Sequence, residues 1–462
     1  MSATTEQTAF RGVFTPVTEE ITAFDLPVTG RIPAELNGRY LRNGPNPGKL
    51  DDPRLHLFLG DGMVHGVRLR DGRAEWYRNR WVRSAKVAER LGEPWAGGPV
   101  HADMDFAANT HVIGHAGRTL AVVEAGARPY ELGYELDTLG VCDFGGTLPG
   151  GYAAHTKLDP RTGELHTIAY YWGWAHLQYI RVGRDGLVTR TVDIPVADSP
   201  MVHDCALTER YVVIYDLPVT FDMSLTGTGV NLPYSWNDRH PARVGLLPRD
   251  GDAGDVRWFP VDPCWVFHTL NAYDDGPDRV VVDVVAYPRL FDGGRLEGGL
   301  PTLDRWTIDT RSGTVTTTRL DDRPQEFPRV DERRISLPHR YGYAAAIGDF
   351  NERLVGGRRE LDELEDDAFG NALIKHDLAT GRKETRTLHR DAYAGEPVFV
   401  PAAGGTAEDD GYVLAYVNNP DRGAADLVIL SAQDFTGEPV AVVHLPARVP
   451  LGFHGSWIPD EM

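Results

Sequence analysis

A histidine near the C-terminal end of the sequence constrains the fold most. His454 lies between glycine and aromatic residues in Leu451-Gly-Phe-His-Gly-Ser-Trp457. Three other histidines, His155, His203 and His268, adjoin apolar residues at turns next to strand-like runs. An unpaired imidazole is costly to bury in such a place, and a shared metal ion would satisfy all four. If the four meet, the C-terminal segment must return across more than half of the chain, which requires a closed, ring-like fold around a metal.

The composition favours many short strands over long helices. The 462 residues include 50 Gly and 32 Pro, which are typical of frequent turns. Strand-like runs such as 211–215, 280–286 and 412–417 recur along the chain, and residues 84–91 are the main helix candidate of the N-terminal half. Because no βαβ alternation and no linker is found, we expect one all-β domain over residues 1–462, with residues 1–12 as a flexible arm.

A weak internal repeat indicates which all-β architecture this is. The pattern D-x-x-[ST]-G occurs at 159–163, 309–313 and 377–381, each time between two strand-like runs. Such hairpin turns, with a glycine that accepts a positive φ, recur in propeller blades. At about 60–70 residues per blade, six or seven blades would use the whole chain. The sequence therefore predicts a single β-propeller.

The bulk properties exclude several classes of function. A formal net charge of −20 argues against nucleic acid as a partner and allows at most weak peripheral contact with a membrane. The three cysteines fit neither a zinc motif nor a disulfide framework. The polar N-terminus does not resemble a signal peptide, and no run approaches the ~18 apolar residues of a membrane span. We expect a cytoplasmic protein whose oligomeric state is open.

Spacing alone does not fix the ligand set, because ligands this far apart leave no local motif. On the same grounds His101, His111 or His176 could replace one of the four. For the remaining histidines in polar surroundings we expect solvent exposure. They are His56, His115, His166, His240, His376, His389 and His444.

Three glutamates stand beside apolar strand-like runs: Glu124, Glu326 and Glu396. A buried carboxylate needs a partner, and the N–H of a metal-bound imidazole is a common one. The alternative is an ordinary salt bridge of these glutamates, for example with Arg329 or Arg333.

Together with the segments around these residues, the chain resembles the carotenoid cleavage oxygenase family from residue 11 to the C-terminus. Any one matching segment is weak, but eight in the family's order make a chance match very unlikely. The segments are 37–47 (NGRYLRNGPNP), 60–65 (GDGMVH), 155–160 (HTKLDP), 201–204 (MVHD), 267–273 (FHTLNAY), 326–330 (EFPRV), 396–400 (EPVFV) and 452–457 (GFHGSW).

The resemblance implies a seven-bladed propeller with a cap of loops and short helices over a non-haem Fe(II) on the axis. It carries the iron ligands onto His155, His203, His268 and His454. The family's outer glutamates fall on Glu124, Glu326 and Glu396. By analogy Glu124 pairs with His203, Glu326 with His268 and Glu396 with His454, so that His155 has no carboxylate.

The reaction implied by the resemblance inserts O2 across a conjugated C=C bond and gives two carbonyl products. The expected substrate is a hydrophobic alkene, a carotenoid or apocarotenoid in the first place and a stilbene or phenylpropanoid in the second. Stilbene-cleaving members typically carry a lysine before the first glutamate, where this chain has Val123. A lipid-ester isomerohydrolase and a non-catalytic propeller that only binds partners are further alternatives. Candidates to line an apolar tunnel, each equally plausible as core, are Phe58, Trp81, Trp265, Phe267 and Phe453.

Overall fold

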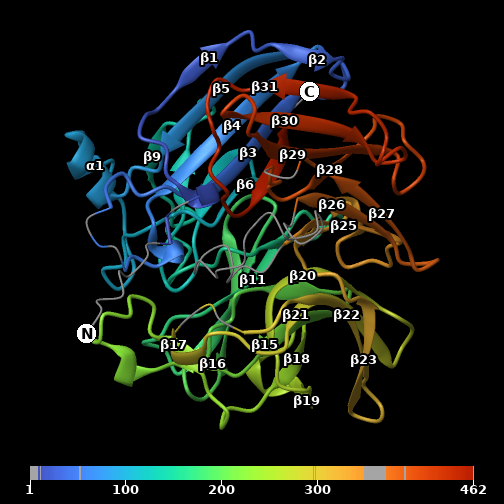
Figure 1. Ribbon diagram of the computed structural model, residues 1–462. Coiled ribbons are helices and arrows are strands. Elements are labelled where there is room, and N and C mark those ends of the chain that lie inside the picture. The colour runs from blue at the N-terminus through green and yellow to red at the C-terminus, as the bar shows by residue number, and fades with distance from the viewer. Residues whose placement is uncertain are drawn as a thin grey trace, which may run out of the picture.

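The fold is a ring of antiparallel sheets. The computed structural model describes residues 9–10, 12–50, 52, 54–294, 296, 298–347, 371–389 and 392–460. Within these residues, seven sheets of four or five strands follow one another around a central axis (Figure 1). A two-stranded ribbon, β16 (Val219–Phe221) with β17 (Tyr234–Trp236), joins two strands of the fourth sheet. The predicted β-propeller is confirmed, with seven blades.

In blade 1 the strands follow one another from the outer edge to the axis, and in blades 2 to 4 from the axis to the outer edge. Blade 1 contains β1 (Thr22–Phe24), β5 (Arg73–Trp81), β4 (Gly62–Arg70), β3 (Gly38–Pro45) and β32 (Gly455–Pro459). Blade 2 contains β6 (His111–His115), β7 (Arg118–Val122), β8 (Tyr130–Leu132) and β9 (Thr138–Val141). Blade 3 contains β10 (Lys157–Leu158), β11 (Leu165–Ala169), β12 (His176–Val182) and β13 (Val188–Pro195). Blade 4 contains β14 (Cys205–Leu207), β15 (Tyr211–Asp216), β18 (Arg243–Pro248) and β19 (Arg257–Pro260).

The other three blades complete the ring. Blade 5 contains β20 (Trp265–Asp274), β21 (Arg279–Tyr287), β22 (Thr302–Asp309) and β23 (Thr314–Asp321). Blade 6 contains β24 (Gln325–Arg329), β25 (Tyr341–Ala346), β26 (Ala372–Asp377) and β27 (Arg382–Thr387). Blade 7 contains β28 (Val398–Pro401), β29 (Gly411–Asn419), β30 (Ala424–Ser431), β31 (Ala441–His444) and β2 (Val28–Gly30).

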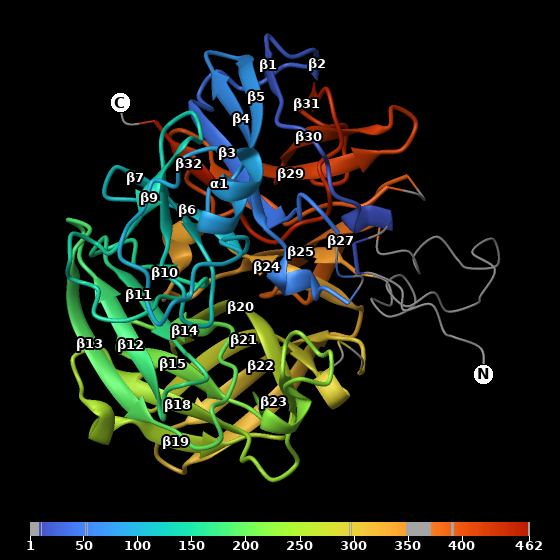
Figure 2. The ribbon, with the colours of Figure 1, turned by 90° about the vertical axis from the view of Figure 1, so that its left-hand side faces the viewer.

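Two strands far apart in the sequence close the ring. The C-terminal strand β32 pairs with β3 and becomes the innermost strand of blade 1, while the N-terminal strand β2 pairs with β31 at the outer edge of blade 7. Figure 2 shows β32 beside β3, and Figure 1 shows the N-terminal strands next to β29–β31. Because β32 begins at Gly455, this closure carries the preceding residue, His454, to the axis.

Apolar contacts between neighbouring blades hold the ring together. One buried cluster joins blades 1 and 7, for instance through Tyr40 and Leu414, and others join blades 1 with 2, 2 with 3 and 6 with 7. The valine-rich strand β21 is buried along nearly its whole length, whereas the outer strand β23 is mostly exposed. Burying one such side chain contributes about 1.5–3 kcal/mol, so the inner strands dominate the stability.

The three D-x-x-[ST]-G segments form the turns that the sequence predicts. They connect β10 to β11, β22 to β23, and β26 to β27. In each, the glycine N–H donates to the aspartate carbonyl at 2.9 Å. The glycines have positive φ angles of 70° to 78°, a conformation that costs glycine little. The repeat therefore marks real hairpins.

Short helical segments and loops lie at both ends of the ring. The only α-helix in the described residues, α1 (Ala85–Leu91), is capped by Ser84 and packs Val87 against Met63 and Trp81. Six 3-10 turns accompany it: η1 (Gly12–Phe14), η2 (Leu57–Leu59), η3 (Met223–Leu225), η4 (Ala253–Asp255), η5 (Asp292–Gly294) and η6 (Glu332–Arg334). Residues from η1 and η2 cover the central cavity, so the cap is made of loops and 3-10 turns, with α1 at its side.

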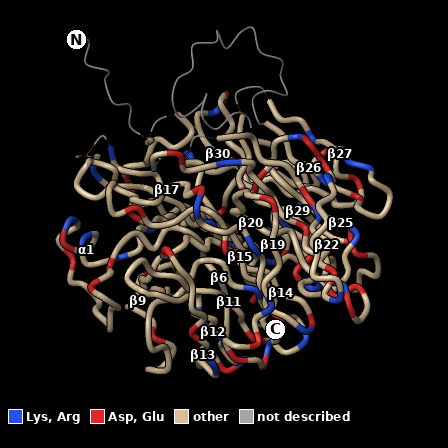
Figure 3. The backbone as a smooth tube through the Cα atoms, turned by 90° about the horizontal axis from the view of Figure 1, so that it is seen from below, with Lys and Arg blue, Asp and Glu red and all other residues tan. Residues whose placement is uncertain are grey.

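The described N-terminal residues are more ordered than the sequence suggested. Phe10, within the expected flexible arm, is buried against Phe14 and Leu57, while residues 1–8 and 11 lie outside the described part of the chain. No helix among the described residues is long and apolar enough to span a membrane. Acidic and basic residues are interspersed along the chain (Figure 3).

Candidate metal centre

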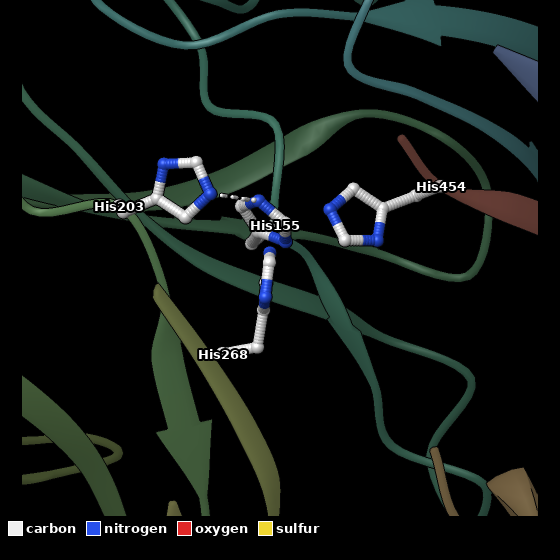
Figure 4. Close-up of side chains that lie close together, drawn as sticks. All are labelled: His155, His203, His268 and His454. Carbon is white, nitrogen blue, oxygen red and sulfur yellow. Dashed lines mark hydrogen bonds between the residues drawn. The ribbon is translucent and has the colours of Figure 1, made fainter. Parts of the chain in front are cut away.

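Four histidines from four blades meet on the axis of the ring. His268 lies within the innermost strand β20, and the other three lie one or two residues before the innermost strands β10, β14 and β32. These inner strands also contact those of the adjacent blades. The ligand nitrogens of the four rings all lie within 4.8 Å of one another, and the Nε2 atoms of His155 and His203 are 3.0 Å apart (Figure 4).

The electrostatics of this cluster suit a metal ion. Burial, reinforced by the neighbouring imidazoles, lowers the pKa of His155 and of His454 well below the ordinary histidine value, so both rings are neutral and keep a lone pair. The Nε2 atom of His268 is buried and has no hydrogen-bond partner in the structure. Nitrogen lone pairs that face one another are costly to bury unless a cation binds them. The donor set therefore fits a transition-metal ion.

Each of three imidazoles donates its Nδ1–H to a carboxylate. His203 Nδ1 lies 2.9 Å from Glu124 Oε1, and His454 Nδ1 lies 2.9 Å from Glu396 Oε1. These contacts fix the tautomer of each ring and aim its Nε2 atom at the centre.

The third pair is the shortest. His268 Nδ1 lies 2.5 Å from Glu326 Oε2. Burial alone would lower the pKa of His268, but the charge and hydrogen bond of Glu326 raise it above the ordinary value. The three pairings are those that the resemblance implied, and His155 has no carboxylate partner among the described residues.

A further layer of side chains holds the carboxylates. Tyr170 Oη donates to Glu124 Oε2 at 2.8 Å, and Tyr287 Oη donates to Glu326 Oε1 at 3.0 Å. Burial and the adjacent carboxylate raise the pKa of both phenols well above the ordinary tyrosine value, so both hydroxyls keep the proton that they donate. Sequence reasoning missed both tyrosines, since no local pattern links them to a glutamate in another loop.

The third carboxylate is held by a guanidinium instead. Arg329 Nη1 donates to Glu396 Oε2 at 2.9 Å, and the Gly455 N–H donates to the same oxygen at 2.8 Å. The alternative of a salt bridge with Arg329 is therefore present for Glu396, which also contacts His454, and Arg329 pairs with Glu332 as well. The other arginine considered, Arg333, pairs with Asp331.

Backbone hydrogen bonds position the ring that comes from the C-terminal segment. The N–H of His454 donates to the Thr110 carbonyl at 3.0 Å, and its own carbonyl accepts from the Asn43 N–H at 2.9 Å. The preceding N–H, of Phe453, donates to the Asn43 carbonyl at 3.0 Å. Blades 1 and 2 thus hold His454 from both sides.

An apolar cavity of about 180 Å³ ends at the histidines. Its wall includes Phe58, Phe267 and Phe453, three of the five aromatic residues nominated by the sequence, and also Val123. The polar groups of the described wall are concentrated near the metal centre, where Glu124, His203 and their neighbours lie. Such a cavity suits a hydrophobic molecule held with one bond close to the histidines.

The structure does not place the two nominated tryptophans in this wall. Trp81 packs with Met63 and Val87 beneath α1, where its Nε1 donates to the Asn46 carbonyl at 2.8 Å. Trp265 lies behind Phe267, edge to face, with ring centroids 5.4 Å apart. It supports the wall without lining it.

The alternative histidine ligands lie outside the cluster. His111 is the nearest, 5.3 Å from His454 between ring centroids, but its Nε2 contacts the hydroxyl of Ser456. His101 Nδ1 contacts the Gly126 carbonyl, and His176 stacks on an indole. The expected exposure of the remaining histidines is wrong for four that are buried with polar partners: His115, His166, His240 and His376.

Comparisons with known proteins identify the family. The family model "RPE65: Retinal pigment epithelial membrane protein" matches residues 14–459. A "Carotenoid cleavage oxygenase" of Mycobacterium tuberculosis is 46% identical, with 99% of each chain covered. The lignostilbene dioxygenase structure from Pseudomonas brassicacearum is 31% identical with a TM-score of 0.85, covering 98% of this chain and 99% of that one. Cobalt-substituted Synechocystis ACO, an apocarotenoid oxygenase, is 28% identical with a TM-score of 0.83, covering 98% of both chains. The chain belongs to the carotenoid cleavage oxygenase (RPE65) family of dioxygenases.

Proposed function

We propose that this protein is an Fe(II)-dependent dioxygenase that cleaves a conjugated C=C bond of a carotenoid or apocarotenoid. One alkene and one O2 give two carbonyl products, so every atom of O2 enters product and no reducing cosubstrate is needed. The observation that carries the proposal is the convergence of four imidazoles at the end of an apolar cavity.

Four histidines would hold the ion, and three glutamates would shape its surroundings. His155, His203, His268 and His454 would bind the ion through four imidazole nitrogens, a donor type that suits ferrous iron. The bound iron supplies the activation of O2 next to the alkene. Glu124, Glu326 and Glu396 keep the Nδ1 proton on their imidazoles and offset part of the ion's charge from outside.

The cavity supports a hydrophobic substrate. Aromatic and aliphatic side chains line it up to the metal centre, and the position before Glu124 is Val123, an apolar wall residue. The similarity to the mycobacterial carotenoid cleavage oxygenase supports the same choice. The second candidate is a stilbene or phenylpropanoid alkene, favoured by the similarity to the lignostilbene dioxygenase. A propeller that only binds partners would have no use for this set of imidazoles and carboxylates.

Metal analysis tests the enzyme itself. Protein purified without oxygen should hold about one iron per chain, as expected of a single four-nitrogen site. The His268→Ala variant should lose the iron and the activity while keeping its far-UV circular dichroism. His101→Ala, a histidine outside the cluster, should keep both. A wild-type protein that stays free of iron after reconstitution would contradict the proposal.

A product screen tests the substrate. The enzyme is incubated in air with apocarotenals, resveratrol and isoeugenol, and the products are identified by mass spectrometry, with 18O2 to trace the oxygen. We expect aldehyde or ketone fragments from the apocarotenals. Phenolic aldehydes as the sole products would establish the second candidate instead.

A further inference from the structure

A second cavity, of about 90 Å³, reaches three of the four histidines, His155, His268 and His454, from the other side. Along β20, Phe267 lines the apolar cavity, His268 borders both cavities, and the following residues line only the second. The same order occurs around His203, since Met201 lines the first cavity and Asp204 the second. The two cavities therefore lie on opposite sides of the metal centre along the propeller axis. We call the second one the axial cavity.

The wall of the axial cavity carries charged side chains of both signs among apolar ones, unlike the described wall of the apolar cavity. Lys157 Nζ lies 2.8 Å from Asp204 Oδ1, and Asp204 Oδ2 accepts from the N–H of Thr269 at 2.9 Å. Arg329 bridges Glu396, beside the histidines, to Glu332 farther out. Charged groups and hydroxyls thus follow one another from the histidines outward.

The axial cavity opens to solvent at its outer end. Glu332, one of its wall residues, has a side chain that is 48% exposed, and Ile335 beside it is half-buried. The inner wall residues Thr269 and Ala272 are buried. Exposure of the wall therefore increases from the buried residues near the histidines toward Glu332 and Ile335.

A divalent cation and a hydrophobic alkene need different routes. Stripping water from an ion in apolar surroundings costs up to tens of kcal/mol, so the apolar cavity is a high barrier for a hydrated ion. The axial cavity has the carboxylates of Asp204, Glu332 and Glu396 in its wall, and carboxylate oxygens can replace water around a divalent cation. We propose that the metal ion reaches and leaves the four histidines through the axial cavity, so that the apolar cavity serves the alkene alone. This inference rests on the proposed metal centre.

Metal exchange kinetics test the route, with Co2+ as the probe because its absorption spectrum reports binding without any turnover. A change in the route alone raises the same barrier in both directions, so uptake and release slow by one factor and Kd stays constant. Damage to the ligands changes Kd instead. Uptake is followed by stopped-flow mixing of metal-free protein with Co2+, and release by transfer to a chelator.

Substitutions in each cavity then separate the two routes. We expect Ile335→Trp, which narrows the axial cavity, to slow uptake and release about tenfold or more at unchanged Kd, equivalent to about 1.4 kcal/mol of barrier. Ile335→Ala should leave both rates equal or faster. Ala272→Leu narrows the same cavity at a second point and should repeat the slowing. Leu300→Trp, at a half-exposed position in the wall of the apolar cavity, should raise the KM for the alkene and leave both metal rates unchanged.

Three results would overturn the axial route. The first is unchanged rates of Co2+ uptake and release in both Ile335→Trp and Ala272→Leu. The second is slower uptake and release in Leu300→Trp, and the third is an altered Kd in both Ile335→Trp and Ala272→Leu. Wild-type protein that binds no Co2+ would instead refute the proposed function. Failure of the inference and failure of the function are therefore told apart by the same measurement.

Discussion

Gly452 lies so close to Arg42 that a β-carbon at position 452 would fall 1.3 Å from Arg42 Nη1. The Arg42 guanidinium is buried and donates to the carbonyls of Pro450 and Asn43. It therefore fixes the path of the chain two residues before the C-terminal histidine. A side chain at position 452 would have to displace either the guanidinium or the backbone that carries His454.

The first prediction concerns this contact. Gly452→Ala should lower the affinity for metal and destabilise the protein by about 1–3 kcal/mol, the usual range for overpacking. Chelator competition measures the affinity and thermal unfolding the stability. Gly254→Ala is the matched control, since nothing lies within 4 Å of its β-carbon. An unchanged affinity in Gly452→Ala would mean that Arg42 moves aside without moving His454.

The second prediction concerns the carboxylates. Glu124→Gln, Glu326→Gln and Glu396→Gln should each lower metal affinity about 10–100-fold, because the amide no longer compels its imidazole to keep the Nδ1 proton. The competition assay used for Gly452→Ala reads this directly. Glu89→Gln, an exposed position on α1, should bind metal like the wild type. Equal affinities in all four variants would show that the carboxylates do not orient the ligands.

The third prediction separates the outer tyrosines from the carboxylates. Tyr287→Phe removes one hydrogen bond to Glu326 and leaves the carboxylate in place, so the loss should be about 0.5–1.5 kcal/mol. We expect metal affinity to fall about tenfold at most, less than in Glu326→Gln. The reverse order, with the tyrosine change the more damaging, would assign Tyr287 a more direct role.

The fourth prediction concerns ring closure. A chain that ends before Gly452 lacks His454 and β32, and so exposes the inner edge of β3. It should bind no metal at the centre and should aggregate or unfold without a cooperative transition. A chain that ends at Asp460 keeps β32 and should behave like the full-length protein. Cooperative unfolding of the shorter chain would show that blade 1 is stable without its innermost strand.

The fifth prediction concerns pH and lies away from the metal. His240 contacts Asp198 through Nδ1 at 2.9 Å and Asp216 through Nε2 at 2.7 Å, and Arg243 also pairs with Asp216. Burial alone would lower the pKa of His240, but the two carboxylates raise it above the ordinary value. A raised pKa in the folded state means that this stabilisation is complete below the unfolded value near 6.5 and is lost as the pH rises through the folded value.

Urea unfolding across this pH range measures the effect. The wild type should exceed His240→Gln in stability most at pH 6, and the margin should shrink steadily at higher pH. Both proteins are compared at the same metal content, so that the metal centre contributes equally. A margin that grows with pH would mean that His240 is neutral in the folded protein.

The sequence predicted those parts of the centre that are tied to local motifs. His268 and Glu326 lie in short, recognisable segments, and the turns around Gly163 and Gly313 follow from backbone conformation alone. The sequence did not predict contacts that depend on how two blades face each other. Tyr287 meets Glu326 from a different blade, and Arg329 passes the neighbouring glutamate to reach Glu396.

The sequence also does not predict which aromatic residues line the cavity. Trp265 and Phe267 are two residues apart on β20, so they lie on the same face of the strand, but only Phe267 reaches the cavity. Composition does not tell which of the two does so. Buried histidines such as His166 were missed because their polar partners, here the hydroxyl of Tyr179, lie on another strand. Nothing in the residues next to His166 reveals that partner.

The pairing of β32 with β3 also sets an order of events during synthesis. Translation runs from blade 1 towards His454, so blade 1 is synthesised before its innermost strand, β32. Blade 1 therefore lacks this strand until the other six blades have been synthesised. The three earlier histidines can be in place before the fourth exists. An ion that arrives early meets an incomplete set of ligands, and its full affinity appears only when the ring has closed.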